Sequence, residues 1–414
     1  MNLFSKRTEV AEANQVERKK YLQTLQILQT LFINGAISIT EIGKIVKIST
    51  PTVFSLLNEL ISENLIEEQG FGTSSGGRRP NLYGLKPNSF FALGVNIGRF
   101  TTRIAIYSNS NEAVSETRNL NLVLSNNPEI VQVICNEANN LLENSGIDRD
   151  KILGVGIDMP GLIDAQKGIN HTFLNFETPI KEIFETALQL PVFIENDAKA
   201  RTFAELRFGL AKGKQNVAVL HLGWGLGTGL ILNGKLYRGE QGYAGEFSHF
   251  PLNENGPLCV CGKKGCLETL ASGMALARLA KEGLEQGKTS LLSSLVNDIN
   301  QIEPRTVVEA AAKGDLFAIG ILSKVGIELG KGIAFLIQLL NPEMIILGWR
   351  LAKANQYLIT PIQQSLYRFT MPELREKTQI VLSQLGQDAN IIGSVAMVFE
   401  KVLETKINEI NNLL

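Results

Sequence analysis

Three of the four cysteines in the chain lie within eight positions, at Cys259, Cys261 and Cys266. His249, one of only three histidines, stands ten residues before the first of them. Thiolate and imidazole are ligands that Zn2+ favours, so this spacing predicts a Cys3His zinc site. Four protein ligands leave no open position for an activated water, which makes the predicted metal structural. The alternatives are a cluster of buried free thiols and a disulfide.

Two carboxylates flank the predicted metal site. Glu246 stands three residues before His249, and Glu268 follows the last cysteine by two residues. Gly262 and Gly265 allow the backbone to turn tightly enough for the three sulfur atoms to converge. We therefore expect the metal to hold acidic side chains in place for the binding of another molecule.

A second polar group follows a hydrophobic segment that we expect to be a strand. Asn196 and Asp197 come directly after Phe193-Ile194-Glu195, and ligands of α/β folds bind at the carboxyl ends of strands. The alternative is that both residues only cap the next helix. Residues 156–161 and 341–348 have the same pattern of a strand that ends in a turn.

The composition restricts the elements that can position these residues. A chain of 414 residues exceeds a single ordinary core, so two or three domains are expected. Hydrophobic residues make up 44% of the chain and charged residues 20%, which excludes global disorder. A net charge of −1 provides no overall attraction to nucleic acid or to an anionic membrane.

Neither a membrane helix nor a signal peptide is expected. No run approaches the roughly eighteen apolar residues of a membrane span, and the first residues lack an apolar stretch with a cleavage site. Few cysteines, most of them in a metal-like spacing, are typical of a reducing compartment. We therefore expect a cytoplasmic protein.

The N-terminal segment begins with the pattern of a helix-turn-helix. Residues 1 to about 15 are polar and are expected to form a frayed arm. Apolar residues at helical spacing predict a helix from about residue 16 to 34, and Gly35 ends it. A second, short helix is expected to start after Ser38.

The third helix of this segment carries small hydroxyl residues at its start. Ser49 or Thr50 can cap it, and Pro51 fits its first turn. Thr50, Thr52 and Ser55 are candidates for contacts with DNA, because the later helix of a helix-turn-helix enters the major groove.

A β-hairpin with a flexible tip is expected to follow these helices. Its strands are predicted at residues 65–68 and 78–85, and its Gly- and Ser-rich loop at residues 70–77. The pattern is typical of a winged helix, in which Arg78 and Arg79 would contact phosphates or a minor groove. A helix-turn-helix that binds another protein is the alternative.

From about residue 89 onward, strands and helices alternate as in a layered α/β fold. A strand, a glycine turn and a second strand occur at residues 90–107 and again at residues 216–232. This repetition predicts a duplicated α/β domain with a cleft between two lobes, and a chance similarity of two hairpins is the alternative. The tail from about residue 390 is expected to be helical.

Together these features resemble the ROK family of repressors, open reading frames and sugar kinases, from about residue 89 to the C-terminus. The most specific similarity is Gly245-Glu246-Phe247-Ser248-His249, followed by Cys259-Val260-Cys261-Gly262-Lys263-Lys264-Gly265-Cys266-Leu267-Glu268. Family members have Gly-Glu-x-Gly-His and Cys-x-Cys-Gly-x-x-Gly-Cys-x-Glu, and Ser248 departs from this pattern. The N-terminal segment resembles the winged helix of the family's regulators.

The resemblance implies an α/β, two-lobed, actin-like fold of the ribonuclease H-like type, preceded by an α+β winged helix-turn-helix domain. The implied domains are residues 1–88, which bind DNA, and residues 89–414, which bind sugar. One lobe would comprise about 89–198 with the C-terminal helix at about 391–414, and the other about 199–390. The resemblance also implies zinc on His249, Cys259, Cys261 and Cys266.

A sugar or sugar phosphate is the implied ligand of the cleft. The implied contacts are Asn196, Asp197, Glu246, His249 and Glu268, with Asn175 as a further contact. Around residues 170–178 the chain is shorter than the family pattern, which puts Asn175 in doubt. Carboxylates and amides form paired hydrogen bonds with neighbouring hydroxyls, and a histidine on zinc keeps one ring nitrogen for the ligand.

The nucleotide side of the kinase pattern is altered. Family kinases have the three nucleotide loops Asp-x-Gly-Gly-Thr, Gly-Thr-Gly and Gly-Gly-Gly. In those kinases the aspartate that corresponds to Asp197 would take the proton of the attacking sugar hydroxyl. Here the three loops are Asn96-Ile97-Gly98-Arg99-Phe100, Gly223-Trp224-Gly225 and Gly348-Trp349-Arg350. Phosphoryl transfer needs Mg2+ and close backbone approach to the phosphates, so these changes predict a protein that is not a kinase.

The sequence thus predicts a sugar-responsive transcriptional regulator of carbohydrate metabolism genes, expected to be a repressor. It would bind operator DNA through the winged helix and its effector in the ROK domain. A homodimer or homotetramer is expected, because two winged helices read two half-sites. The alternative is an ATP-dependent sugar kinase with an attached DNA-binding domain.

Overall fold

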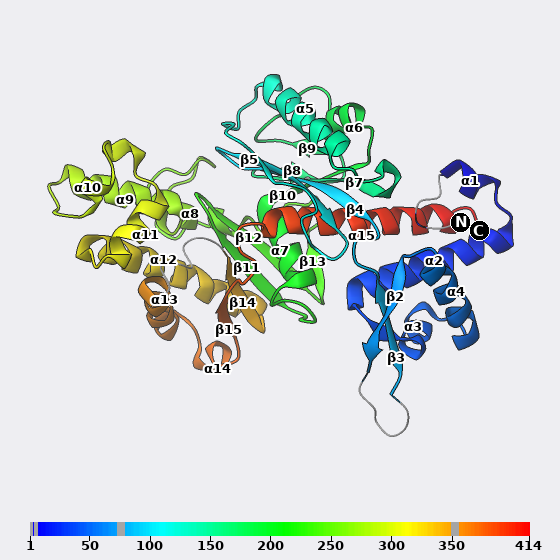
Figure 1. Cartoon of the computed structure of the whole chain (residues 1–414). Coiled ribbons are helices and arrows are strands. Elements are labelled where there is room, and N and C mark those ends of the chain that lie inside the picture. Colours follow the sequence, from blue (N-terminus) through cyan, green and yellow to red (C-terminus); the bar gives the residue numbers. More distant parts are fainter. Residues whose placement is uncertain (1–2, 4–6, 73–78, 349–355) are drawn as a thin grey trace. The chain divides into compact units, whose positions relative to one another are not determined.

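The structure is a computed structural model that describes residue 3 and residues 7–72, 79–348 and 356–414 (Figure 1). The chain divides into two compact units, Met1–Asn196 with Ile391–Leu414, and Asp197–Asn390. None of the described helices combines the length and the apolarity that crossing a membrane requires.

The first unit begins with helices α1 (Arg7–Glu12) and α2 (Gln15–Asn34). The expectation of a frayed arm is therefore wrong for α1. Arg18 on α2 donates hydrogen bonds to the carbonyl oxygens of Val10 at 3.2 Å and Ala11 at 2.5 Å. Because the last carbonyls of a helix lack intrahelical partners, the guanidinium group stabilises a helix of only six residues.

The next two helices are the predicted helix-turn-helix. Helix α3 (Ile39–Val46) is capped by Ser38, whose side chain and backbone exchange hydrogen bonds with Glu41 in a capping box. Helix α4 (Thr50–Ser62) is capped by Ser49, whose hydroxyl accepts the Thr52 N–H at 3.4 Å. Both helix starts are thus determined by hydroxyl residues close in sequence.

A three-stranded antiparallel sheet follows, in the order β1 (Ile37–Ser38), β3 (Asn81–Leu85), β2 (Ile66–Phe71). Strands β2 and β3 form the predicted wing. The second of them begins at residue 81, and the described residues 79 and 80, which were predicted to belong to it, lie outside it, since Pro80 has no N–H to donate to a sheet. Residues 73–78, with most of the predicted tip and Arg78, lie outside the described residues.

The first unit also contains a five-stranded sheet in the order β10-β7-β4-β5-β6. Strand β4 (Phe91–Ile97) is antiparallel to β5 (Thr102–Ser108) and parallel to β7 (Ile152–Met159). Strand β10 (Val192–Asn196) is parallel to β7, and the short β6 (Arg118–Leu120) lies at the other edge.

The second unit repeats this plan in a sheet of order β13-β12-β11-β14-β15. Strand β11 (Val217–Leu222) is antiparallel to β12 (Leu226–Leu232) and parallel to β14 (Met344–Gly348), which is parallel to β15 (Gln379–Leu382). The matching order and directions confirm the predicted duplication and disfavour a chance similarity of two hairpins.

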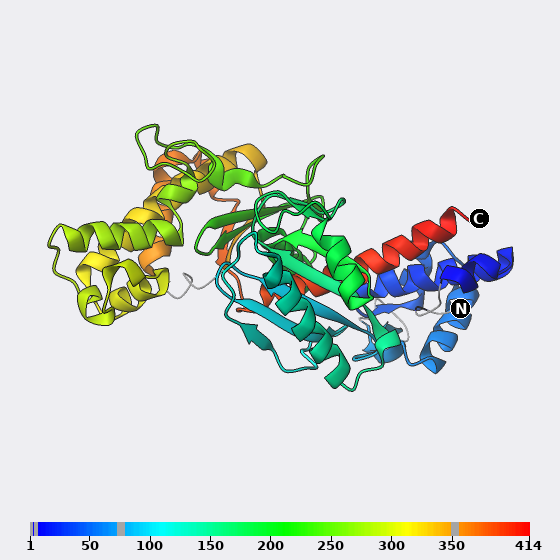
Figure 2. The same cartoon turned by 90° about the horizontal axis from the view of Figure 1, so that it is seen from above.

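Helices and short elements complete each unit (Figure 2). The first unit adds α5 (Pro128–Asn144), η1 (Arg149–Lys151), β8 (Ile163–Asp164), β9 (Ile169–Asn170), α6 (Ile180–Leu188) and most of α15 (Ala389–Asn411). The second unit adds α7 (Asp197–Phe208), β13 (Lys235–Tyr237), η2 (Glu246–His249), α8 (Leu267–Leu270), α9 (Gly273–Glu285), α10 (Leu292–Leu295), η3 (Ile299–Gln301), α11 (Pro304–Ala312), α12 (Leu316–Leu340), α13 (Gln356–Phe369) and α14 (Pro372–Arg375).

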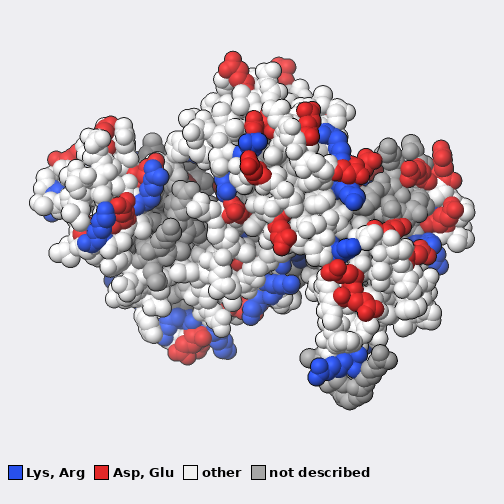
Figure 3. All heavy atoms as spheres, viewed as in Figure 1, with Lys and Arg blue, Asp and Glu red and all other residues white. Residues whose placement is uncertain are grey.

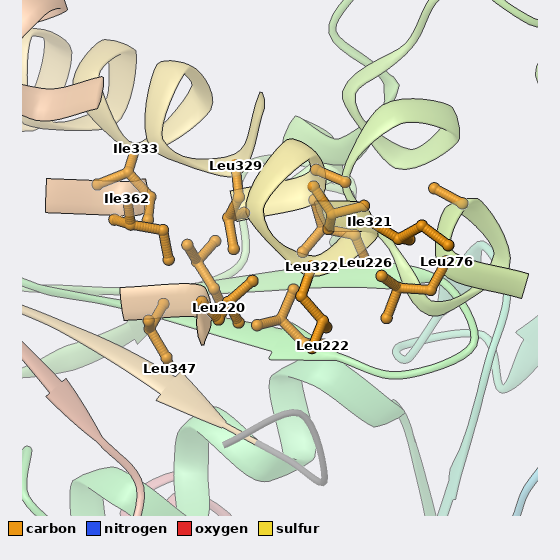
Figure 4. Packing of buried hydrophobic residues seen from close by; sticks show 14 of the residues in the cluster. Leu220, Leu222, Leu226, Leu276, Ile321, Leu322, Leu329, Ile333, Leu347 and Ile362 are labelled. Carbon is orange, nitrogen blue, oxygen red and sulfur yellow. The ribbon is translucent and has the colours of Figure 1, made fainter. Parts of the chain in front are cut away.

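Helix α12 covers one face of the second sheet. Its residues Leu322 and Leu329 lie over Leu220 and Leu222 of β11, and all four side chains are buried (Figure 4). Burying one leucine stabilises a fold by about 1.5–3 kcal/mol, so the packing of α12 on β11 stabilises this sheet. The loops that carry the candidate site extend from the strands of this supported sheet.

Candidate functional site

The four predicted metal ligands lie together in the second unit. The Sγ atoms of Cys259, Cys261 and Cys266 and one ring nitrogen of His249 lie within 4.8 Å of one another. Cys259 Sγ is 3.4 Å from His249 Nδ1, and Cys261 Sγ is 3.6 Å from Cys266 Sγ. Zn–S bonds of about 2.3 Å at tetrahedral angles place two sulfur atoms about 3.8 Å apart, so these pairs have the spacing of a zinc site.

The loop backbone explains this convergence. Gly262 and Gly265 have φ angles of +86° and +62°, as the sequence predicted for a tight turn. A Cβ at position 265 would lie 1.6 Å from the carbonyl oxygen of Asn253, which excludes any other residue there. Cys261 is exposed, which disfavours a cluster of buried thiols, and its sulfur lies farther from Cys266 than the about 2.05 Å of a disulfide.

The imidazole of His249 lies near two carboxylates. Its Nε2 is 3.9 Å from Oε2 of Glu246, and its Nδ1 is 3.9 Å from Oε2 of Glu268. Because Nδ1 also faces Cys259, it is the nitrogen that would bind a metal. Nε2 then remains available on the side of Glu246.

Glu268 also contacts the glycine loop between β11 and β12. Its Oε1 accepts the backbone N–H of Leu226 at 3.4 Å. A Cβ at Gly225 would lie 2.5 Å from the same oxygen, so this carboxylate fills the space that a side chain would need. The loop therefore determines where Glu268 lies.

Asp197 is the first residue of α7, and its Oδ1 accepts the N–H of Ala198 at 2.8 Å. The side chain is half-buried. This burial raises the pKa of the Asp197 carboxyl above its usual value, and the charge of Glu246 acts in the same direction. The guanidinium group of Arg201 opposes both effects on the pKa. Asp197 and Glu246 therefore belong to one group of acidic side chains.

Asn196 and Asn175 belong to the first unit. The amide of Asn196 donates to the Gly161 carbonyl at 3.1 Å, so the side chain is held at the end of β10. Asn175 is exposed, and its backbone N–H donates to Asn126 Oδ1 at 3.4 Å. Both residues remain expected sugar contacts rather than observed ones.

The loops on the nucleotide side contain one feature that the sequence did not reveal. Asn96 Nδ2 donates to Asp158 Oδ1 at 2.5 Å, from opposite positions of the parallel strands β4 and β7. The altered turn after Asn96 lacks a carboxylate, but the neighbouring strand supplies one, and it is fully buried. Of the third altered loop only Gly348 is described, and Trp349 and Arg350 lie outside the described residues.

The expected DNA contacts lie at the start of α4 and beside the wing. Thr50 and Ser55 are exposed, and Thr52 is half-buried with its hydroxyl 2.7 Å from that of Ser49. Arg79 is exposed just before β3. Lysine or arginine atoms lie at the described end of the β2–β3 hairpin, whereas charges of both signs mix over the rest of the face shown (Figure 3).

Sequence reasoning missed Arg201 and Asn390. Asn390 Oδ1 accepts the Nε–H of Arg201 at 3.0 Å, and its Nδ2 donates to the Asp197 carbonyl at 3.2 Å. Both side chains are buried. Arg201 could have been suspected because it stands four residues after Asp197, hence on the same helix face. Nothing in the sequence indicated Asn390.

Two family matches agree with this structure. Residues 92–401 match the ROK family, and the chain belongs to that family. Residues 22–67 match the family described as winged helix-turn-helix DNA-binding. The predicted family, the α/β fold class and the N-terminal helix-turn-helix are thereby confirmed.

Regulators and kinases are both among the relatives. The chain is 29% identical over 387 residues to the xylose repressor of Caldicellulosiruptor bescii, which covers 93% of this chain and 97% of the repressor. It is 26% identical over 396 residues to the dual regulator NagC of Escherichia coli, and the alignment covers 95% of this chain and 96% of NagC. The glucokinase of Thermotoga maritima is 31% identical over 314 residues, covering 75% of this chain and 98% of the kinase.

Solved structures show the same two kinds of protein. A ROK family transcriptional regulator, described as a homolog of the E. coli MLC protein, has a TM-score of 0.79 at 24% identity, covering 94% of this chain and 99% of that one. At this identity the likeness shows the fold alone. The ROK glucokinase of Streptomyces griseus, in complex with glucose and AMPPNP, has a TM-score of 0.66 at 31% identity. The match covers 74% of this chain and 98% of the glucokinase.

Proposed function

We propose that this protein is a sugar-responsive transcriptional repressor of carbohydrate metabolism genes. The observation that carries the proposal is the presence, in one chain, of a capped helix-turn-helix with a wing and a ROK domain. The xylose repressor and NagC align with this whole arrangement, whereas the glucokinase is matched by three quarters of the chain. DNA binding would place the protein in the compartment that holds the DNA, in keeping with a cytoplasmic protein.

The proposed effector is a sugar or sugar phosphate. The proposed contacts with its hydroxyls are Asn175, Asn196, Asp197, Glu246, His249 and Glu268. Acidic and amide groups suit vicinal hydroxyls, because each can accept or donate more than one hydrogen bond. D-Xylose and D-glucose, with their phosphates, are candidates that follow the names of the xylose repressor and the glucokinase. N-acetylglucosamine is a third, because the N-acetylglucosamine repressor of Escherichia coli O6:H1 is 26% identical to this chain over 396 residues.

Zn2+ is the proposed metal, held by His249, Cys259, Cys261 and Cys266. The spacing of the donor atoms and the thiolate-rich set support zinc over magnesium or calcium, which prefer oxygen ligands. Bound metal would hold His249 and the loop that leads into Glu268. Its role would be structural, since no ligand position is left open.

The proposed domain limits are residues 1–88 for the DNA-binding domain and 89–414 for the ROK domain. Within the ROK domain, the proposed lobes are about 89–198 with 391–414, and about 199–390. A homodimer or homotetramer is proposed, because a two-fold assembly would present two winged helices to two half-sites.

A sugar kinase is the second candidate. The observation that favours it is the buried carboxylate of Asp158 beside Asn96, which places an acid next to the altered first loop. Trp224 in the second loop argues against it, because phosphates require close approach of small backbone turns.

A sugar panel with two readouts tests both candidates. Thermal shift with xylose, glucose, N-acetylglucosamine and their phosphates should identify a ligand that raises the unfolding temperature. That ligand should then change the affinity for a DNA duplex selected from a random library. Sugar-dependent consumption of ATP that is lost in Asp197→Asn would overturn the regulator proposal in favour of the kinase.

A further inference from the structure

Helix α15 (Ala389–Asn411) begins in the second unit and continues through the first. At its first turn, Asn390 bonds to the Arg201 side chain and to the Asp197 carbonyl, at 3.0 and 3.2 Å. Arg201 also reaches the carbonyl of Gly386, in the turn before the helix, at 3.5 Å. The start of α15 is therefore attached to the residue at which a sugar is proposed to bind.

In its next turns, α15 lies directly on the backbone of the first sheet. Gly94 of β4 and Gly156 of β7 lie opposite each other in register. A Cβ at Gly94 would lie 2.5 Å from Ile391, and one at Gly156 would lie 2.3 Å from the Ser394 carbonyl oxygen. Such close contact prevents α15 from sliding or bending here, since packed interiors resist compression, so the helix can move only by pivoting as a rigid body on this contact.

The later turns of α15 contact the DNA-binding segment. The buried ring of Phe399 stacks edge-on against Phe32 of α2 and against Phe90, with centroids 5.8 and 5.1 Å apart. Just after the helix, the Leu413 carbonyl accepts a hydrogen bond from Arg18 of α2 at 3.1 Å. Helix α2 in turn packs against α3 of the helix-turn-helix. Helix α15 thus contacts Asp197 through its first turn and α2 through a later turn.

From these contacts we propose that Asn390 and Arg201 are positioning residues that transmit sugar binding at Asp197 through α15 to the winged helix. A helix of 23 residues spans about 35 Å, so a small tilt at its start becomes a larger displacement at its end. The sugar would act by favouring one orientation of the Asp197–Asn390 contact, since a ligand shifts an equilibrium only through contacts that differ between states. The inference rests on the proposed sugar-responsive function.

The test separates sugar binding, DNA binding and the coupling between them. Asn390→Ala removes both side-chain hydrogen bonds at the start of α15. Asn408→Ala is the matched control, because it makes the same change at an exposed position of the same helix. Sugar affinity is measured by calorimetry with whichever of xylose, glucose or N-acetylglucosamine binds, and DNA affinity by fluorescence anisotropy with and without that sugar.

In the wild type and in Asn408→Ala, the sugar should change DNA affinity by about 5–150-fold, the usual range for coupled sites. In Asn390→Ala this ratio should approach one, while sugar affinity and sugar-free DNA affinity change little. A second variant, Asn390→Asp, keeps an acceptor for Arg201 but loses the donor to the Asp197 carbonyl. It should lose the response too, and it remains informative if the alanine variant unfolds.

Two results would overturn the inference. One is a wild-type response in both Asn390 variants, and the other is a loss of sugar-free DNA affinity, which would mark a merely structural role. Failure of the proposed function would look different, because the wild type and Asn408→Ala would then bind DNA equally with and without the bound sugar.

Discussion

The Nδ1 atom of His249 lies 3.4 Å from the Sγ of Cys259, while its Nε2 faces the carboxylate of Glu246. One imidazole therefore adjoins both the predicted metal and the acidic side chains proposed to bind sugar. Because ring orientation follows from the bond at the other nitrogen, the metal would aim Nε2 at the ligand.

Loss of the metal should therefore weaken sugar binding. Cys261→Ser replaces an exposed thiolate by a poor zinc ligand, and we expect metal content to fall and sugar affinity to drop at least about tenfold. Zinc is measured by mass spectrometry of the intact protein and sugar affinity by calorimetry.

Cys135→Ala is the control for this change. Cys135 is buried on α5 in the first unit, and burial raises the pKa of its thiol to about 11, so it remains a protonated core side chain. Its removal should leave metal content and sugar affinity unchanged. Full sugar affinity in metal-free wild-type protein would contradict the role given to zinc.

The contact between Gly225 and Glu268 yields a second prediction. In Gly225→Ala the new Cβ would lie 2.5 Å from Glu268 Oε1, and the flexible carboxylate end must move away. We expect sugar affinity to fall by about tenfold, the effect of about 1.4 kcal/mol of lost contact, with metal content unchanged.

A glycine with open space around it provides the control. Gly320 is exposed on α12, and a Cβ there would have no atom within 4 Å. Gly320→Ala should leave sugar affinity intact and stabilise the protein by up to about 1 kcal/mol through its helix propensity. If both alanine variants bound sugar like the wild type, Glu268 would not belong to the sugar site.

The raised pKa of Asp197 predicts a pH-dependent effect on stability. The folded protein binds this proton more tightly than the unfolded chain, so the ionised carboxylate costs stability at neutral pH. Asp197→Asn should therefore raise the free energy of unfolding near pH 7, because the neutral amide carries no charge that burial disfavours.

This gain should shrink on acidification, because the wild-type carboxyl becomes protonated as the pH falls through its folded pKa toward the ordinary value of 3.8. Thermal unfolding of both proteins from pH 7 downward checks the sign. A difference in stability that grows as the pH falls would show that the buried carboxylate is stabilised as an ion.

Arg79 provides a prediction for DNA binding. It is exposed beside the wing, and as a phosphate contact it would release about one counterion. Arg79→Ala should weaken binding to specific and random duplexes alike, and reduce the slope of log affinity against log salt by about one. Lys377→Ala, an equal charge change at an exposed position of the second unit, should do neither. A loss confined to the specific duplex would indicate base contact instead.

The N-terminal helices were predictable because their signals are local. Ser38 and Ser49 accept hydrogen bonds from residues three positions ahead, and Gly35 adopts a positive φ just after α2. Helix α1 escaped prediction because its support comes from Arg18, on the next helix. Stabilisation of a short helix by a neighbouring element leaves no pattern in its own residues.

The metal-binding part of the candidate site, which lies in the second unit, was predictable because its signals are also local. His249, the three cysteines and Glu268 lie within twenty residues, and tight glycine turns bring such near neighbours together whatever the rest of the chain does. The carboxylate beside the altered first loop could not be foreseen, because Asp158 reaches Asn96 through strand pairing across sixty-two positions.

The sequence by itself determined the family, the duplicated plan of the sheets, the donor set for a metal and the capped helices of the DNA-binding segment. The family followed from the resemblance of residues 245–249 and 259–268 to its motifs, and the other features from patterns and spacings that can be read along the chain. The tertiary structure alone decided that Asn390 joins Arg201 and Asp197, 189 and 193 positions earlier, and that the same helix reaches Phe32. Such partners are selected by how the units fold and pack, and a buried amide has no sequence pattern that announces which carbonyl it will meet.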